Sequence, residues 1–383
     1  MKELFFKCIK KIKNYRYKSL NFRLMILVGV LTILGINVIG SASEGTGNME
    51  KQIFGMVVGI VAVAILILFD YHFILKFYWL IYIVNIFLLL LVRLMGRTGG
   101  GAMRWLEIGG GIQIQPSEFA KVFLILFFAK LIMKRKEKLN TFRFIVLCVI
   151  LLGIPLALIF IQPDLSTSIL IVLLFCSIMY IAGISYKVVF SVLGIGAIVA
   201  VALVYLIMQP NQNILKGYQL KRIIAFYDSD SEYTDELLYQ QENSVIAMGS
   251  GGLWGKGLYN DNPDSIKNGN YLFASHTDFI FAIVGEELGF VGCMAVMIIL
   301  FLIIIECFIV GAHAPDIGGK IIACSLGSLI GFQSVINMMV VTMMIPNTGL
   351  TLPFVSYGLS SLLSLYIGVG IVLNISMQRK RDI

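Results

Sequence analysis

Uninterrupted apolar segments of about 20 residues recur along almost the whole chain, and this recurrence limits the folds open to it. A helix of that length spans the hydrocarbon core of a bilayer. Helices satisfy their own backbone hydrogen bonds in lipid, and the alternating pattern of a membrane β-barrel is absent from the sequence. The sequence therefore predicts an all-α, polytopic membrane protein with about ten transmembrane helices. We place them at residues 24–42, 53–69, 77–92, 117–133, 144–161, 165–184, 188–208, 279–310, 321–344 and 357–377.

The composition supports this class of protein and excludes others. Hydrophobic residues make up 58% of the 383 residues and charged residues 14%, whereas soluble domains average about 25% charged. This balance excludes a soluble globular enzyme and a disordered chain. The six cysteines form no CxxC pair and the three histidines are widely scattered, so neither a disulfide framework nor a metal motif is predicted. The N-terminal stretch does not resemble a cleavable signal peptide, because further spans follow it at once.

Clusters of Lys and Arg predict how the spans are oriented. Residues 1–23 carry eight basic residues and one acid, and further basic clusters lie at 134–143 and at the 378–383 tail. Cytoplasmic segments of membrane proteins are enriched in Lys and Arg, so we expect all three on the cytoplasmic side, flanking or interrupting one transmembrane domain at 24–377. The net charge of +8 follows from these clusters, and no nucleic-acid partner is needed to explain it.

The longest polar stretch, residues 209–277, is expected to lie outside, between the seventh and eighth spans. It carries five basic and eight acidic residues. Its Gly-rich segment 249–257 lets the backbone approach another group closely, but it is no P-loop, because Ser250 stands where the first glycine belongs. A second outer loop, 94–116, contains Arg104 and Trp105. Long loops are usually functional or disordered, so we expect the chemistry on the outer face.

Ionisable side chains near the membrane are the candidate functional residues, because burying a charge is costly. Glu118 and Lys121 are three residues apart, share a helix face and could form a purely structural pair. Asp164 follows Pro163 at an outer turn, where it could equally be a helix cap. Asp278 is expected to begin the eighth span, where it could simply complement the helix dipole. These residues alone leave open a transporter and a lipid-processing enzyme.

Several motifs, taken in order, resemble one known family. They are Arg104-Trp-Leu-Glu-Ile-Gly, Gln115-Pro-Ser-Glu-Phe-Ala-Lys121, Gln162-Pro-Asp-Leu165, Tyr218-Gln-Leu-Lys-Arg222, Ala247-Met-Gly-Ser-Gly-Gly252, His276-Thr-Asp-Phe-Ile-Phe-Ala282, Gly285-Glu-Glu-Leu-Gly289 and Pro346-Asn-Thr-Gly-Leu-Thr-Leu-Pro-Phe-Val-Ser-Tyr-Gly358. Together they resemble the SEDS family, which includes FtsW, RodA and SpoVE. Three further segments favour the elongation (RodA) branch, with the division and sporulation branches as the close alternative: Asp70-Tyr71, Gly252-Leu-Trp-Gly-Lys-Gly257 and Ser275-His-Thr-Asp-Phe279.

The resemblance implies an activity, partners and a set of site residues. It implies a multi-pass protein of the bacterial plasma membrane that polymerises lipid II into β-1,4-linked glycan strands and releases undecaprenyl pyrophosphate. A class B penicillin-binding protein, the elongation machinery and membrane lipids are the implied partners. Asp278 is the implied catalytic carboxylate. Residues implied to bind substrate or support the site are Arg104, Trp105, Gln115, Glu118, Lys121, Gln162, Asp164, Arg222, Ser250, His276, Thr277, Glu287 and Ser356.

The chemistry of this reaction fits the residues. Pyrophosphate is a good leaving group, so one carboxylate base that deprotonates the acceptor hydroxyl is sufficient. Lys121, Arg104 and Arg222 could stabilise the departing pyrophosphate, and Mg²⁺ or Mn²⁺ could do the same, although no motif fixes a metal. The competing hypotheses are a lipid II flippase and a purely structural scaffold. A flippase needs alternating access and favours internal repeats, and we find no clear repeat in the sequence.

Overall fold

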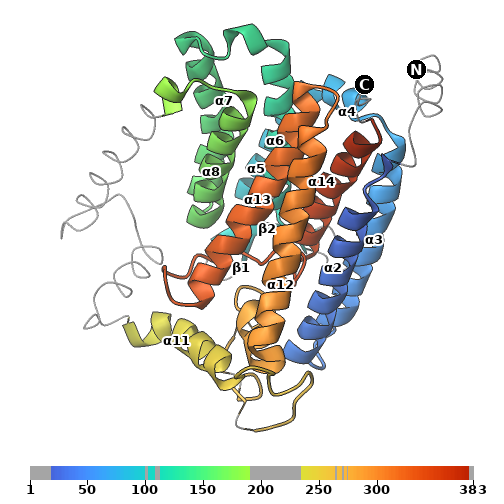
Figure 1. Cartoon of the computed structure of the whole chain (residues 1–383). Coiled ribbons are helices and arrows are strands. Elements are labelled where there is room, and N and C mark those ends of the chain that lie inside the picture. The colour runs from blue at the N-terminus through green and yellow to red at the C-terminus, as the bar shows by residue number, and fades with distance from the viewer. Residues whose placement is uncertain are drawn as a thin grey trace, which may run out of the picture.

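The computed structural model describes residues 19–99, 102–107, 113–189, 234–263, 265–269, 271–273 and 275–378. Nine of the ten predicted spans correspond to long helices in this part of the chain, and these form one bundle (Figure 1). The seventh, at 188–208, lies almost wholly outside the described residues. The nine helices are α2 (Phe22–Ala42), α3 (Asn48–Leu68), α5 (Tyr78–Met95), α6 (Pro116–Lys134), α7 (Phe142–Ile161), α8 (Leu165–Ala182), α12 (Ile280–Ala312), α13 (Ile317–Val341) and α14 (Leu359–Met377).

Hydropathy separates one of these helices from the others. Eight of the nine are long and apolar enough to cross a membrane, and α6 is the exception. It carries four charged residues, Glu118, Lys121, Lys130 and Lys134. Most of its side chains are buried by other helices, so α6 lies inside the bundle, where a charged pair can be shielded from lipid.

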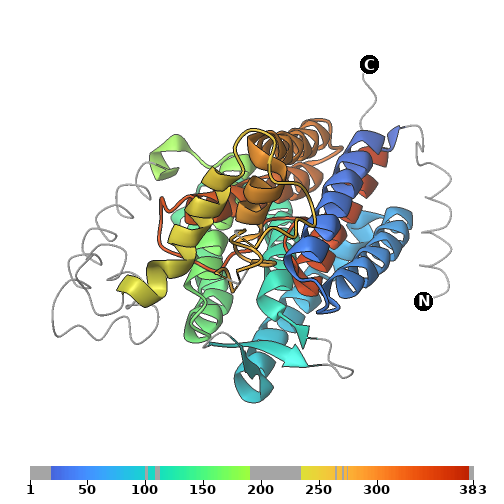
Figure 2. The ribbon, with the colours of Figure 1, turned by 90° about the horizontal axis from the view of Figure 1, so that it is seen from below.

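Burial distinguishes the centre of the bundle from its lipid-facing rim. In the membrane-spanning part of α14, 83% of the residues are buried, against 17% in α3. Figure 2 shows α14 packed along α3, and α12 packs along both α13 and α2. Exposed apolar side chains such as Ile60, Phe87 and Phe301 cover the outside of the bundle. A bundle with an apolar exterior and polar side chains inside is the arrangement expected in lipid.

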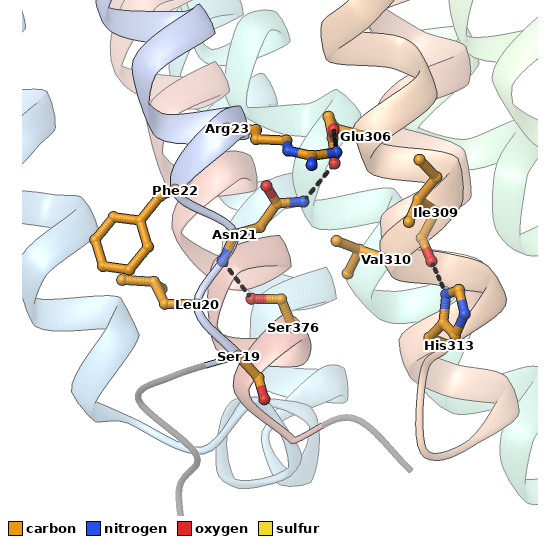
Figure 3. A pocket seen from close by; sticks show the side chains of 10 residues that line it. All are labelled: Ser19, Leu20, Asn21, Phe22, Arg23, Glu306, Ile309, Val310, His313 and Ser376. Carbon is orange, nitrogen blue, oxygen red and sulfur yellow. Dashed lines mark hydrogen bonds and ion pairs between the residues drawn. The ribbon is translucent and has the colours of Figure 1, made fainter. Parts of the chain in front are cut away.

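The first and last helices of the bundle meet at one end. The Asn21 backbone N–H donates to Ser376 Oγ at 3.3 Å, and Asn21 Nδ2 donates to Glu306 Oε2 at 2.7 Å. Figure 3 shows these contacts in a pocket of about 410 Å³ between the start of α2 and the ends of α12 and α14. The described helices adjoining the two termini therefore lie on the same face, as the even number of predicted spans requires.

A histidine between two carboxylates joins helices at this same end. The short helix α4 (Tyr71–Lys76) is capped by Asp70, whose Oδ1 accepts the His72 backbone N–H. The His72 ring lies 2.8 Å from Asp70 Oδ1 through Nδ1 and 2.7 Å from Asp316 Oδ2 through Nε2. These hydrogen bonds, first that to Asp316 and then that to Asp70, raise the pKa of His72 from 6.5 to about 9. The α3–α4 corner is thereby tied to the start of α13.

The opposite end of the bundle holds the elaborate segments. The helix α11 (Thr234–Ser250) lies there across the ends of the long helices (Figure 1). The outer loop 94–116 contains a small antiparallel sheet of β1 (Arg97–Gly99), β2 (Ala102–Glu107) and β3 (Gln113–Ile114), in the order β1-β2-β3. Neither α11 nor the sheet was predicted, because both are shorter and more polar than the apolar spans.

Candidate active site

The loop between α13 and α14, residues 346–358, is the point on which the predicted site residues converge. We call it the signature loop. Its backbone includes Gly349, whose φ of +73° lies in the left-handed region that favours glycine. Side chains and backbone groups from α3, α8, α11, α13 and α14, and from the residues just before α12, make hydrogen bonds to it. Three polar groups that are distant in sequence are brought together in this way.

The first group is the segment that carries Asp278. Asp278 was predicted to begin a span, but α12 begins at Ile280 with Phe279 as its N-cap and no side-chain cap. Asp278 therefore does not cap the helix. Its backbone carbonyl accepts a hydrogen bond from Asn337 Nδ2 at 2.8 Å. A Cβ built on Gly349 would lie 3.5 Å from Asp278 Oδ2, so the carboxylate lies against the backbone of the signature loop.

The two residues before Asp278 are held by the same loop. The His276 carbonyl accepts the Tyr357 N–H at 2.9 Å, and the Thr277 carbonyl accepts Ser356 Oγ at 2.7 Å. Burial lowers the pKa of His276, so its imidazole is neutral at pH 7. The motif 276–278 thus contains a carboxylate and an uncharged ring, with each of its three carbonyls hydrogen-bonded.

The second group is the ion pair on α6. Lys121 Nζ donates to Glu118 Oε2 at 2.9 Å and to Gln333 Oε1 at 3.1 Å, and all three side chains are buried. Gln333 Nε2 then donates to the Thr351 carbonyl at 2.9 Å. The predicted pairing of Glu118 with Lys121 is present, and it is continued to the signature loop. Because its charge is balanced and two of its three donors are engaged, the buried Lys121 is a poorer candidate for binding pyrophosphate than the sequence suggested.

The third group surrounds Asp164. Asp164 caps α8 by accepting the Thr167 N–H at 3.2 Å, as one interpretation of the sequence predicted. It also lies 3.9 Å from Arg104 Nη1 and 3.5 Å from Gln115 Nε2. Arg104 donates in addition to the Pro163 carbonyl. Two residues further along α8, Ser166 donates to the Thr348 carbonyl and so connects this group to the signature loop.

Several predicted residues lie apart from these groups. Gln162 donates to the Leu89 carbonyl at 2.9 Å, and Ser250 donates to the Ala247 carbonyl within its own helix. Trp105 is half-buried in β2. Glu287 accepts Lys267 Nζ at 2.9 Å and Ser41 Oγ. Its contacts are structural. Arg222 lies outside the described residues, so its role stays a prediction.

The glycines of 249–257 approach a break in α12. Gly289 has non-helical backbone angles, φ 67° and ψ −165°. On one side of the break, the Lys256 and Gly257 N–H groups donate to the Glu286 and Glu287 carbonyls, both at 2.9 Å. On the other side, the Phe290 and Val291 N–H groups donate to carbonyls of residues 252 and 253. A Cβ on Gly255 would lie 2.1 Å from the Glu287 carbonyl oxygen, so glycine is required by backbone contact with α12.

Sequence reasoning missed several residues of the site. Gln333 and Asn337 are buried amides four residues apart on α13, and both donate to the signature loop. Their signal was available, because two amides at i and i+4 in an otherwise apolar span share one face. Glu286 appeared in the sequence analysis only as part of the motif 285–289. It accepts Lys256 Nζ at 2.8 Å and the Ile266 N–H at 2.9 Å, and it thereby fixes the outer loop to α12.

The donor set does not fit a resident divalent cation. Among the described residues, no group of three or more His, Cys, Asp or Glu side chains could hold a metal ion. Glu118 is paired with Lys121, and Asp164 is close to Arg104. Mg²⁺ that is bound together with a substrate pyrophosphate needs only one or two protein carboxylates, so this finding concerns a resident metal. We assign no step of the reaction to a metal.

The fold and site define a polytopic membrane protein with a polar site built on loops at one end of its bundle. Comparison with known proteins identifies the family. Residues 17–381 match the FtsW/RodA/SpoVE family, described as "Cell cycle protein", and the chain belongs to this SEDS family. A relative from Bacillus subtilis (strain 168), named "Probable peptidoglycan glycosyltransferase FtsW", is 33% identical over 381 residues, covering 96% of this chain and 92% of the relative.

Solved structures agree with the family. A chain from the structure described as "Structural coordination of polymerization and crosslinking by a peptidoglycan synthase complex" matches with a TM-score of 0.78 and 25% identity, covering 94% of this chain and 99% of that one. The rod shape determining protein RodA of Thermus thermophilus matches with a TM-score of 0.70 and 25% identity, covering 96% of this chain and 99% of RodA. The predicted SEDS resemblance and the all-α membrane fold are both confirmed.

Proposed function

We propose that this chain polymerises lipid II into β-1,4-linked glycan strands with release of undecaprenyl pyrophosphate, and that it is of the division type. The broader class follows from the family and its relatives: the chain is a peptidoglycan glycosyltransferase. The observation that carries the proposal is the placement of Asp278. It is the carboxylate of a segment whose three successive carbonyls are all hydrogen-bonded from the signature loop and α13.

Asp278 acts in this proposal as the general base. It would accept the proton of the sugar 4-hydroxyl as the oxygen attacks the anomeric carbon of the donor. The carbon–oxygen bond to pyrophosphate breaks on the opposite face, which gives inversion. Because pyrophosphate leaves without protonation, one carboxylate is enough. His276 lies two residues before Asp278 and is neutral at pH 7, so its ring can donate or accept a hydrogen bond without adding a charge to the site.

Arg104 is the cation best placed to stabilise the leaving group among the described residues of the three groups. Lys121 is engaged with Glu118 and Gln333. The Arg104 side chain keeps partial exposure, 24%, while it lies near Asp164. A guanidinium suits phosphate because its donors form a planar fork. Arg104 therefore has the geometry and the access to bind pyrophosphate oxygens as charge develops on them.

The division type replaces the elongation type as our main hypothesis. The segments Asp70-Tyr71 and 252–257 favoured the elongation branch in the sequence analysis. The curated relatives at 30–34% identity, however, carry the name FtsW, the division branch. The structural match to RodA supports the common fold, which both branches share. Asp70 caps α4 and Gly255 contacts α12, so these segments have structural roles that do not distinguish the branches.

A penicillin-binding protein of class B is the proposed partner, and the plasma membrane the proposed location. The first is supported by the similarity to a chain of a peptidoglycan synthase complex. The second is supported by the eight apolar helices. We propose that both termini are cytoplasmic and that the signature loop faces outward, where this substrate is polymerised. Asn21, Ser376 and Glu306 mark the cytoplasmic end in this arrangement.

Gel analysis of labelled lipid II incubated with the purified chain, alone and with a class B penicillin-binding protein, tests the function. Wild type should give glycan strands. Asp278→Asn should lower the rate about 100-fold or more with a melting temperature close to wild type, because asparagine keeps the size of the side chain and the backbone carbonyl that accepts Asn337. Near wild-type polymerisation by Asp278→Asn would overturn the assignment of the base. Transfer of lipid II across vesicle membranes without polymerisation would support the flippase instead.

A further inference from the structure

Two buried amides on α13 connect the Asp278 segment with the Glu118–Lys121 pair, and neither has a role in the reaction described above. Gln333 and Asn337 lie one helical turn apart, with exposures of 0% and 1%. Asn337 Nδ2 donates both to the Asp278 carbonyl at 2.8 Å and to the Leu350 carbonyl at 2.7 Å. Gln333 Nε2 donates to the next carbonyl of the loop, that of Thr351. One helix face therefore holds two consecutive carbonyls of the signature loop and the residue that carries the base.

We propose that Gln333 and Asn337 are positioning residues that set the direction of the Asp278 carboxylate and link it to the Glu118–Lys121 pair. The proposal rests on Asp278 being the base. Asn337 is the side chain that joins Asp278 and Leu350 directly, and Leu350 follows Gly349, against which the carboxylate lies. A small displacement of this junction moves the carboxylate relative to the loop. Misplacing a reacting group by about 1 Å can lower a rate about 100-fold.

The hydrogen bonds of Asn337 show which half of its amide matters. Nδ2 makes both contacts, whereas Oδ1 is buried and has no hydrogen-bond partner within the described residues. An unpaired buried oxygen lowers the stability of the fold. The Asn337 amide is nevertheless oriented so that Nδ2 donates both hydrogen bonds. Gln333 differs in using both halves: its oxygen accepts Lys121 Nζ and its nitrogen donates to Thr351. Gln333 and Asn337 together therefore connect Lys121 on α6 to the part of the signature loop that lies beside Asp278.

The isosteric change Asn337→Asp tests the role of the donated bonds. A carboxylate there cannot donate, and a protonated carboxyl can donate to one carbonyl instead of two. We expect kcat of the full-length chain, assayed with lipid II and a class B penicillin-binding protein, to fall about 100-fold while KM changes less than about twofold. Gln333→Glu keeps the acceptor for Lys121 and loses the donor to Thr351, so it should also lower kcat.

A matched control separates positioning from general destabilisation. Asn374 on α14 is also a buried amide that bridges backbone groups, those of Ile67 and Tyr71, at the opposite end of the bundle. Asn374→Asp should lower the melting temperature as much as Asn337→Asp and leave kcat per folded molecule unchanged. If both variants reduce kcat equally, or if Asn337→Asp and Gln333→Glu both retain wild-type kcat, the positioning role is refuted. Should Asn337→Asp fail to fold, the result for Gln333→Glu decides.

Combining Asn337→Asp with Asp278→Asn distinguishes failure of this inference from failure of the proposed function. If Asn337 acts through the Asp278 carboxylate, it should change the residual rate of Asp278→Asn by less than about twofold, because residues that act as a unit are strongly non-additive. A full multiplicative loss in the double variant would show that Asn337 acts independently, and would overturn the inference alone. A wild-type rate for Asp278→Asn by itself would instead overturn the base assignment.

Discussion

Replacing Lys121 by methionine is the sharpest test of how the buried charges are balanced. The Lys121 side chain is 1% exposed, and its ammonium group serves both Glu118 and Gln333. Methionine is similar in length and apolar, so the change leaves a carboxylate and an amide oxygen without their donor. Removing one partner of a buried ion pair costs about 3–5 kcal/mol. A chain of this size has an unfolding entropy of about 0.8 kcal/mol/K, so the melting temperature should fall by about 5 °C.

Thermal unfolding of the purified full chain, with matched variants, measures this cost. Glu118→Gln removes the negative charge but keeps an oxygen for Lys121, so it should be destabilised less than Lys121→Met. The double variant Glu118→Gln with Lys121→Met contains no unpaired charge and should recover most of the lost stability. Losses that simply add in the double variant would refute the pairing. A Glu118→Gln protein with normal melting but no polymerisation would show a direct chemical role for Glu118.

Three further predictions address other parts of the molecule. His72→Gln should be less stable than wild type by about 3 kcal/mol at pH 6. This difference in stability should disappear as pH rises through about 9, because the raised pKa of His72 stabilises the fold only while the ring is protonated. Unfolding measured from pH 6 to 10 tests this, and a difference that stays constant with pH would contradict the prediction. Gly255→Ala should abolish folding or activity, since its Cβ would meet the Glu287 carbonyl oxygen at 2.1 Å; normal melting and polymerisation would show that the α12 break can move. Single cysteines at the exposed Asp261 and Lys136, with the six native cysteines removed, test sidedness: an impermeant maleimide should label Asp261→Cys in cells whose outer barrier is opened and Lys136→Cys only after lysis, and the reverse pattern would invert the topology.

The amino-acid sequence was enough to predict the class of fold and the positions of most of its long helices. Apolar segments of about 20 residues can only be helices in lipid, because their backbone groups have no other partner there, and nine of the ten predicted spans are helices in the described part of the chain. The pairing of Glu118 with Lys121 was also predictable, since side chains three residues apart lie on one helix face. These features depend on the spacing of residues within one segment, so the sequence of that segment is enough to predict them.

Which of the candidate residues lie together depends on the tertiary structure. Asn337 and Leu350 are distant from Asp278 in sequence, and only the packing of α13 against α12 brings the Asn337 amide to the Asp278 carbonyl. The start of α12 at Ile280 likewise depends on contacts of residues 276–278 with the signature loop. The glycines of 249–257 indicated a close approach, but the partner, the break at Gly289, lies in another segment. Contacts between segments depend on how the helices pack, and no single segment contains that information.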